Sequence, residues 1–175
     1  IGLNGINITK FNPNQRRKIG LLSAPEERLG HAAAPNMSLI ENTLITAENS
    51  QNLVYRGFID WKKSKAFAEK VIKKFDVRTP GSQNTAGSLS GGNLQKFVIG
   101  REILQNPSVF IVNQPTWGVD AAAASSIRQA LLTLSENGAA ILVISQDLDE
   151  LLEISDQFAA LNGGALSLSL IHISE

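Results

Sequence analysis

Apolar and polar residues follow one another along this chain in patterns that predict short strands and amphipathic helices. A continuous apolar run at 109–112 and a second stretch at 139–145, apolar through 144, have the pattern of buried parallel strands. An Ala-rich helix is expected between them over 121–135, a short helix over 147–154 and a last strand over 157–161. This alternation of three strands with two helices predicts a parallel sheet with right-handed crossovers.

The residues before these runs predict smaller elements at the start of the chain. Residues 1–9 alternate weakly around Asn4 and Gly5, a tight-turn signal, and predict a short edge ribbon. One helical turn is expected over 13–18, and a strand over 19–23 that leads into a loop.

The middle of the chain predicts a mainly helical region over 38–104. Ser38 and Glu41 have the spacing of a capping box for a helix that reaches about residue 47. Asp60 is expected to cap a second helix over 61–75, in which every fourth residue on one face is apolar, and a third helix is expected over 95–104.

The composition is that of a globular protein, with 175 residues, of which 43% are hydrophobic and 18% charged. The longest interior apolar run is far short of the roughly 20 residues that cross a bilayer. Because the chain has no cysteine, disulfides, thiolate zinc sites and cysteine nucleophiles are excluded. The net charge is zero, which argues against a nucleic-acid partner, although 13 basic and 7 acidic residues precede Ser88 and 3 basic and 9 acidic residues follow from it.

Ser90, Gly91 and Gly92 directly precede a predicted helix. Backbone amides at a helix start, with no side chains in the way, can approach an anion closely, although such a turn alone is more often a connector. Polar clusters follow at 113–120 and 145–150, each directly after a predicted strand. Since ligands bind at the carboxyl ends of parallel strands, these clusters predict a site at one sheet edge.

This ordered set of segments resembles the ATP-binding-cassette (ABC) ATPases. Residues 89–96, LSGGNLQK, resemble the signature motif of sugar and nucleoside importers, and 109–116 lie where the family has its Walker B strand. Residues 117–120 match its D-loop, and 145–147 fall at its switch histidine. Upstream, 24–28 resemble the Q-loop region of the second ATPase half, with Glu26 in the glutamine position.

The resemblance covers about residues 1–167 and implies an α/β fold, a P-loop NTPase-like parallel sheet with an inserted helical subdomain. It divides the chain into a remnant of the ATP-binding core with the Q-loop region (1–35), a helical subdomain ending in the signature helix (36–104) and a RecA-like core with Walker B, D-loop and switch region (105–167). Residues 168–175 resemble the translated end of a sequencing adapter, so we exclude His172 from functional argument. We therefore expect a fragment, truncated at its amino terminus, of the second, carboxyl-terminal cassette of a longer protein.

Three departures from the family pattern change the expected chemistry. The sequence has no G-x-x-x-x-G-K-[ST] phosphate loop, the Walker A motif. Asn113 and Gln114 stand where an acidic pair would hold Mg²⁺ and orient the attacking water. An amide cannot accept a proton, so hydrolysis that relies on Gln114 should fall by about 10²- to 10⁴-fold. Gln146 replaces the switch histidine and carries no positive charge.

The resemblance implies that ATP and Mg²⁺ lie between two cassettes, the phosphate loop of one facing the signature of the other. The expected partner is a second cassette, the amino-terminal half of the same polypeptide, and the isolated fragment is expected to be inactive. Gln114 and Gln146 are the expected degenerate catalytic positions, and Asn113 the degenerate metal position. The expected nucleotide-binding residues are Ser90, Gly91, Gly92, Asn93, Gln95, Glu26 and Asp120.

The function implied is that of the ATP-binding subunit of an importer for simple sugars or nucleosides, peripheral on the cytoplasmic side of the cell membrane. Its partners would be membrane permease subunits and, indirectly, an external substrate-binding protein. The loop 25–35 and the sequence 114–118 look closer to nucleoside importers. Alternatives are a soluble ABC ATPase of DNA repair or translation, which the neutral charge disfavours, and a non-hydrolysing regulatory cassette.

Plain structural roles remain open for several of these polar residues. Asp120 has the position of an N-cap for the helix that follows, a role compatible with a D-loop aspartate. Asp147, Asp149 and Glu150 are expected to interact with a helix dipole rather than to form a metal site. His31 is expected in a surface loop, and Trp117 at an interface with the partner cassette.

Overall fold

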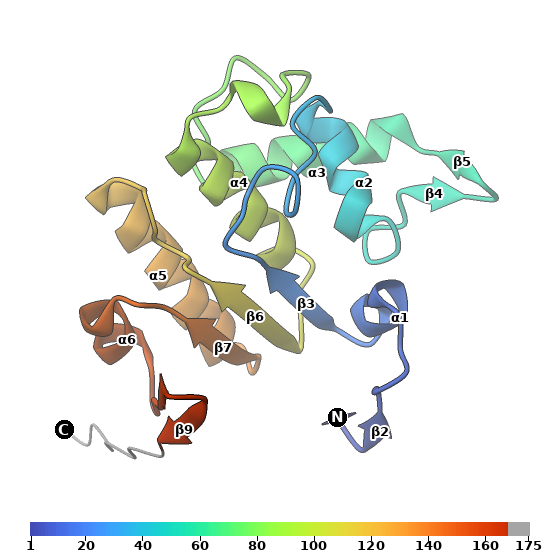
Figure 1. Ribbon diagram of the computed structural model, residues 1–175. Helices are drawn as coiled ribbons and strands as arrows, with labels where there is room; N and C mark the ends of the chain where they lie inside the picture. The colour runs from blue at the N-terminus through green and yellow to red at the C-terminus, as the bar shows by residue number, and fades with distance from the viewer. Residues whose placement is uncertain (168–175) are drawn as a thin grey trace.

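The computed structural model describes residues 1–167, and its central feature is a three-stranded parallel sheet (Figure 1). The strands are β3 (Leu21–Ala24), β6 (Val109–Asn113) and β7 (Ala140–Ile144), side by side in the order β3–β6–β7. In the register, Phe110 of β6 lies between Leu22 of β3 and Ile141 of β7. The predicted α/β class and the parallel pairing of β6 with β7 are confirmed.

One face of this sheet carries the core. Helices α4 (Gly91–Ile103) and α5 (Ala121–Glu136) pack against it, and Phe110 and Val112 are fully buried there. Side chains on the opposite face of β7 are open, since Leu142 is 53% and Ile144 48% exposed. The prediction that β7 is a buried strand is therefore wrong for one of its faces, because within residues 1–167 these two side chains are only partly covered.

The helical region begins with α2 (Leu39–Ala47) and α3 (Trp61–Lys74), which pack against each other and against α4 (Figure 1). The capping box is confirmed: the Ser38 backbone N–H donates to the Glu41 carboxylate at 2.7 Å, and the Glu41 N–H donates to Ser38 Oγ at 3.1 Å. Asp60 caps α3 by accepting from the Lys63 N–H at 3.0 Å. The predicted apolar face of α3 is buried in the core at Phe67, Val71 and Phe75.

Two features of this region differ from the prediction. A hairpin of β4 (Val54–Tyr55) and β5 (Phe58–Ile59) projects from it, with both turn residues, Arg56 and Gly57, at positive φ (Figure 1). The signature helix α4 begins at residue 91 rather than 95, so the two glycines form its first turn. A short 3₁₀ helix, Ala86–Ser88, precedes it.

Small elements lie at the two ends of the described chain. The predicted ribbon with its Asn4–Gly5 turn is present as β1 (Gly2–Leu3) and β2 (Ile6–Asn7), but it forms a sheet of its own and is followed by α1 (Pro13–Lys18). None of the helices within residues 1–167 is long and apolar enough to span a bilayer.

The last predicted strand is wrong in position and pairing. After α6 (Leu148–Ile154), β8 (Ala160–Asn162) and β9 (Ala165–Ser167) pair antiparallel with each other and do not join the parallel sheet. The physical reason is the turn at Gly163 and Gly164, both at positive φ, which favours a local hairpin over a distant strand. The adapter-like segment with His172 lies outside the described residues.

Candidate functional site

The first turn of α4 presents backbone amides without a side-chain cap. Its N-cap residue, Ser90, is extended, and its side chain does not accept from the helix amides. Ser90 Oγ instead accepts from Asn93 Nδ2 at 2.9 Å, while Asn93 Oδ1 accepts from the Arg78 N–H at 2.8 Å. The Asn93 side chain therefore holds the serine, and the amides at the start of this 13-residue helix remain available to an anion.

This turn opens into a pocket of about 450 Å³. Its other wall is the segment Gly118–Asp120 together with the start of α5. The structure thus brings together two segments in which the sequence predicted nucleotide-binding residues, the signature turn and the D-loop. The lining residues include Ser90, Gly91, Gly92, Asn93, Gly118, Val119, Asp120, Asp76, Arg78 and Lys96.

Charged side chains surround the pocket. Lys96 Nζ donates to the Asp76 carbonyl at 2.7 Å and lies 3.6 Å from the Asp76 carboxylate. Asp120 accepts from the Ala123 N–H at 2.8 Å, so its role as an N-cap is confirmed. That hydrogen bond, with smaller contributions from the charges of Lys96 and Arg78, lowers the pKa of Asp120 below its ordinary value. The aspartate is thus ionised at neutral pH.

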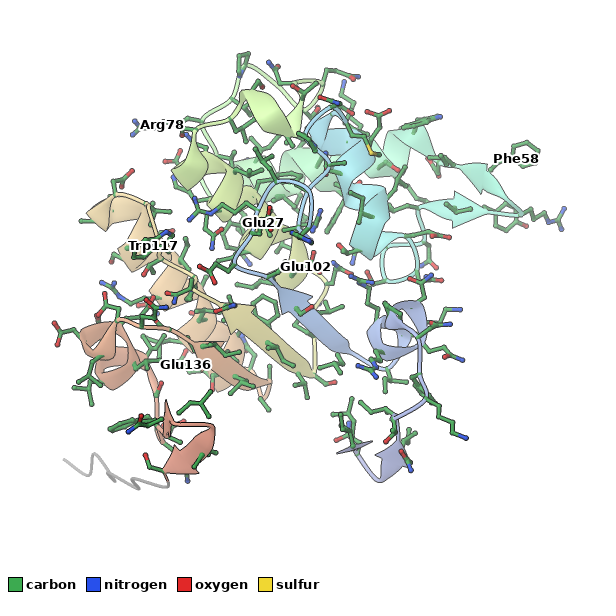
Figure 2. The ribbon with its side chains drawn as sticks, viewed as in Figure 1. Glu27, Phe58, Arg78, Glu102, Trp117 and Glu136 are labelled. Atoms are coloured by element: carbon green, nitrogen blue, oxygen red, sulfur yellow. The ribbon has the colours of Figure 1, made fainter. Side chains whose placement is uncertain are left out.

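Arg78 and Lys96 are pocket residues that the sequence reasoning did not select. Arg78 follows the end of α3 and is separated from the signature by a loop, so no local pattern connects the two. Lys96 is the last residue of the LSGGNLQK motif, and its position in that motif could have identified it as a pocket residue. Figure 2 shows Arg78 at the outer edge of the molecule and Trp117, 64% exposed, beside the same region.

The degenerate catalytic positions lie at the carboxyl edge of the sheet rather than in this pocket. Asn113 ends β6 opposite Ile144, and Gln114 follows with a positive φ of 49° and an N–H that donates to the Ile144 carbonyl at 2.7 Å. The Gln114 side chain is buried and that of Gln146 is exposed. The degenerate catalytic positions and the signature turn, which were predicted to serve different nucleotide sites, therefore lie in two separate places.

Glu26 and Gln95 also lie outside the pocket lining. Glu26 is exposed in the loop after β3. Gln95 is only 1% exposed, and its side-chain amide bonds to Arg28 and to the Pro115 carbonyl. Direct contact between Gln95 and a nucleotide does not fit this placement, because both ends of its amide are engaged inside the chain.

The carboxylates of the described residues do not gather into a metal site. Within residues 1–167, no group of three His, Cys, Asp or Glu side chains is arranged to hold a metal. Asp147 caps α6 by accepting from the Glu150 N–H at 3.1 Å, and Glu150 accepts from Ser145 Oγ at 2.7 Å, so these carboxylates serve the helix start. His31 is exposed and lies 2.6 Å from Glu27, as expected for a surface-loop histidine.

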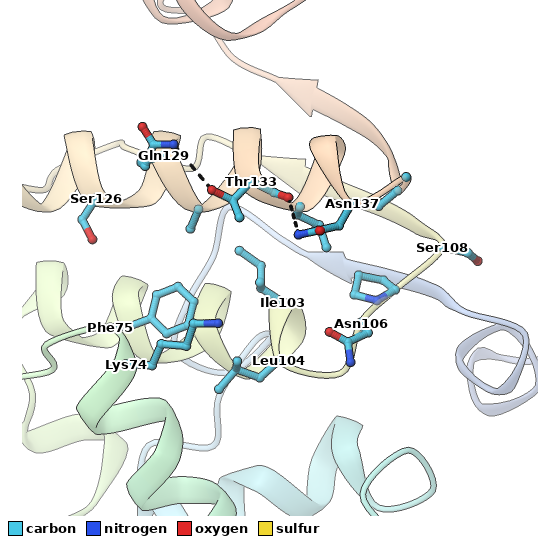
Figure 3. A pocket seen from close by; sticks show the side chains of 15 residues that line it. Lys74, Phe75, Ile103, Leu104, Asn106, Ser108, Ser126, Gln129, Thr133 and Asn137 are labelled. Carbon is cyan, nitrogen blue, oxygen red and sulfur yellow. Dashed lines mark hydrogen bonds between the residues drawn. The ribbon is translucent and has the colours of Figure 1, made fainter.

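A larger pocket of about 650 Å³ lies between α5 and the carboxyl-terminal ends of α3 and α4 (Figure 3). Several polar groups along α5 are engaged within the helix: Gln129 donates to Thr133 at 3.5 Å, and Asn137 donates to the Thr133 carbonyl at 2.7 Å. No motif residue of the sequence lines it. The signature pocket is therefore the better candidate for the functional site.

Solved structures with this fold are ATP-binding cassettes. A dimeric cassette in a post-hydrolysis state bound to ADP and Pi matches 94% of this chain and 69% of its own, with a TM-score of 0.72 and 20% identity. The ADP conformation of another ABC transporter cassette matches 91% of this chain and 63% of its own, with a TM-score of 0.66 and 26% identity. The fold is thus that of an ABC ATPase cassette.

Sequence relatives make the relationship more specific. The nucleoside import ATP-binding protein NupA of Lactococcus lactis is 36% identical over 166 residues, and the arabinose import ATP-binding protein AraG of Vibrio parahaemolyticus is 37% identical over 167 residues. Each match covers 95% of this chain but only 33% of the relative, so the chain spans about a third of their length. No protein-family model matches the chain. The chain thus has the fold of ABC cassettes, and the relatives to which it is similar in sequence are sugar and nucleoside import ATP-binding proteins.

Proposed function

We propose that this chain is part of the ATP-binding subunit of an ABC importer for sugars or nucleosides, and that its signature turn binds a nucleotide held by a partner cassette. The observation that carries the proposal is the uncapped first turn of α4, which opens into a pocket shared with the D-loop. The relatives are import proteins, which favours this function over a role in DNA repair or translation.

The residues of the pocket fit the terminal phosphates of ATP. Amides of Gly91 and Gly92 at the helix start donate toward an anion, and the helix dipole adds a favourable field. Arg78 and Lys96 supply positive charge at the rim. Asp120 accepts from the α5 amides rather than from either cation, while Lys96 also contacts Asp76. The bound nucleotide would supply the phosphoanhydride bond that is hydrolysed, and the signature turn of this chain would orient the nucleotide.

The edge of the sheet would contribute little to hydrolysis. Gln114 is buried and has an amide where a proton acceptor is needed, and Asn113 offers a metal no charge. In this proposal, turnover takes place at the composite site whose signature is Ser90–Gly92 and whose phosphate loop and catalytic carboxylate belong to the partner. We further propose that the partner is the amino-terminal half of the same polypeptide.

The assembly would sit on the cytoplasmic side of the cell membrane, with permease subunits beside it and an external substrate-binding protein acting through them. The names of the relatives support an importer. Copurification of the full-length protein with a membrane permease tests this part of the proposal, and copurification with nucleic acid alone would contradict it.

The test of the site compares two variants in the two-cassette protein. Ser90→Arg places a bulky side chain at the turn and should lower the ATPase rate by about 10²-fold or more, as loss of transition-state donors does. Gln114→Ala should change the rate little, because that position no longer has a proton acceptor. An unchanged rate in Ser90→Arg would refute the proposal.

A further inference from the structure

Arg28, in the loop after β3, connects two segments that are distant from it in the sequence. Its Nε donates to Gln95 Oε1 at 2.8 Å, across a separation of 67 positions. Its Nη2 donates to the backbone carbonyl of Trp117. One guanidinium therefore bonds both to the signature helix and to the segment that carries the D-loop.

Gln95 extends this connection into the core. Its Nε2 donates to the Pro115 carbonyl at 2.8 Å and approaches the Gln114 carbonyl at 3.4 Å. The side chain is 1% exposed, so these hydrogen bonds are shielded from water and an unmade one would be costly. Arg28 and Gln95 together tie α4 to two successive parts of the segment after β6.

The same guanidinium lies beneath the pocket. A Cβ at Gly91 would come within 3.0 Å of Arg28 Nη1, and a Cβ at Gly118 within 3.7 Å of Nη2. Within residues 1–167, Arg28 forms no ion pair, and burial lowers its pKa below the ordinary value. The Arg28 guanidinium is thus held by hydrogen bonds to the Gln95 amide and the Trp117 carbonyl rather than by a carboxylate.

We propose that Arg28 is a positioning residue that locks the signature turn to the D-loop, so that both meet the nucleotide as one rigid unit. The proposal rests on the function proposed above and deepens it. Arg28 itself does not line the pocket; it acts through Gln95 and through the backbone at residues 115–117. A loop that follows a core strand would thereby control the geometry of a site completed by another cassette.

The first test is hydrogen exchange on the full chain, which does not depend on nucleotide. In Arg28→Met, the amides of Leu94, Trp117 and Val119, which are hydrogen-bonded within these two segments, should exchange about tenfold faster. Amides of β6 and β7 should stay within about twofold. Arg56→Met, on the exposed β4–β5 hairpin, is the matched control and should change none of them. A uniform increase along the chain, or no increase, would overturn the positioning role.

The second test measures ATPase kinetics in the two-cassette protein. Arg28→Met should lower kcat by about 10- to 100-fold, since small misplacements of a site have effects of this size. KM should change by less than about threefold, because the phosphate contacts remain. Arg28→Lys keeps the charge but not the two-pronged donor, so it should recover only part of the rate.

A double-variant comparison separates this role from general destabilisation. Because Arg28 acts partly through Gln95, the loss of rate in Gln95→Leu combined with Arg28→Met should be smaller than the product of the two single losses. Losses that multiply would overturn the proposal. Ser90→Arg is measured in parallel to separate the two proposals. If Ser90→Arg keeps its ATPase activity, the proposed function is refuted. If Ser90→Arg is inactive while Arg28→Met is fully active, only the positioning role of Arg28 is refuted.

Discussion

Arg101 and Glu102, neighbours on α4, form an ion pair of 2.7 Å that is closed off from solvent, with their side chains 2% and 0% exposed. The arginine also donates to the carbonyls of Asn42 and Ala32 at 2.9 and 2.8 Å. Glu102 accepts from Thr46 Oγ1 at 2.7 Å (Figure 2 labels Glu102). This pair therefore ties the signature helix to α2 and to the loop after β3.

Removing one member of the pair is expected to destabilise the chain strongly. Glu102→Ala should lower the free energy of unfolding by about 3–5 kcal/mol, because it leaves the arginine charge buried without its partner. Urea denaturation measures the change. Thr46→Val removes only one hydrogen bond to the same carboxylate and should cost about 1 kcal/mol. Equal losses in the two variants would contradict the importance of the ion pair.

The capping box of α2 predicts a pH dependence of stability. The hydrogen bonds from Ser38 lower the pKa of Glu41 below its ordinary value of 4.5. Since the folded pKa lies below the unfolded one, this stabilisation is present above the unfolded pKa and is lost as the pH falls through the folded pKa. Thermal melting between about pH 7 and about pH 3 should therefore show a larger loss for the wild type than for Glu41→Gln.

Ser38→Ala provides the control for that interpretation. It should cost about 1 kcal/mol at neutral pH, as the loss of an N-cap does. It should also reduce the loss of stability at low pH, but by less than Glu41→Gln does, because only the hydroxyl hydrogen bond is removed and the backbone N–H of residue 38 still donates to Glu41. If both variants lose as much stability at low pH as the wild type does, the pH dependence comes from other carboxylates.

Gly100 is a helix position at which alanine should destabilise. A Cβ there would lie 2.5 Å from Phe75 Cδ2, and that ring is buried between α3 and α4. In an open helix, Gly→Ala is favourable by about 1 kcal/mol. Here the overlap should reverse the sign, and Gly100→Ala should cost about 1–3 kcal/mol in thermal or urea unfolding.

Gly92, on the same helix, is the matched control with the opposite expectation. Its Cβ would meet Val119 at 3.7 Å, an ordinary contact, so Gly92→Ala should leave the stability unchanged or raise it. In the two-cassette protein the same methyl group should obstruct a phosphate at the turn and lower the ATPase rate. Full activity in Gly92→Ala would contradict the proposed approach of the nucleotide to the helix start.

Local patterns in the sequence were sufficient for the elements that depend on near neighbours. The Ser38–Glu41 capping box, the Asp60 cap and the apolar face of α3 all involve residues three or four positions apart, and all three are confirmed. The β4–β5 hairpin was missed because its Arg56–Gly57 turn is a weak signal and its strands have two residues each. The final hairpin was misassigned because strand partners depend on the competing turn at Gly163 and Gly164.

The sequence by itself determined the family resemblance, the helix starts and the amide substitutions at Asn113 and Gln114, because motifs and caps are short-range information. Only the tertiary structure decided that Asp120 and Ser90 share a pocket, that Gln95 faces inward and that Arg28 joins it across 67 positions. Those contacts depend on how strands and helices stack, and the energy that selects one stacking is distributed over the whole core.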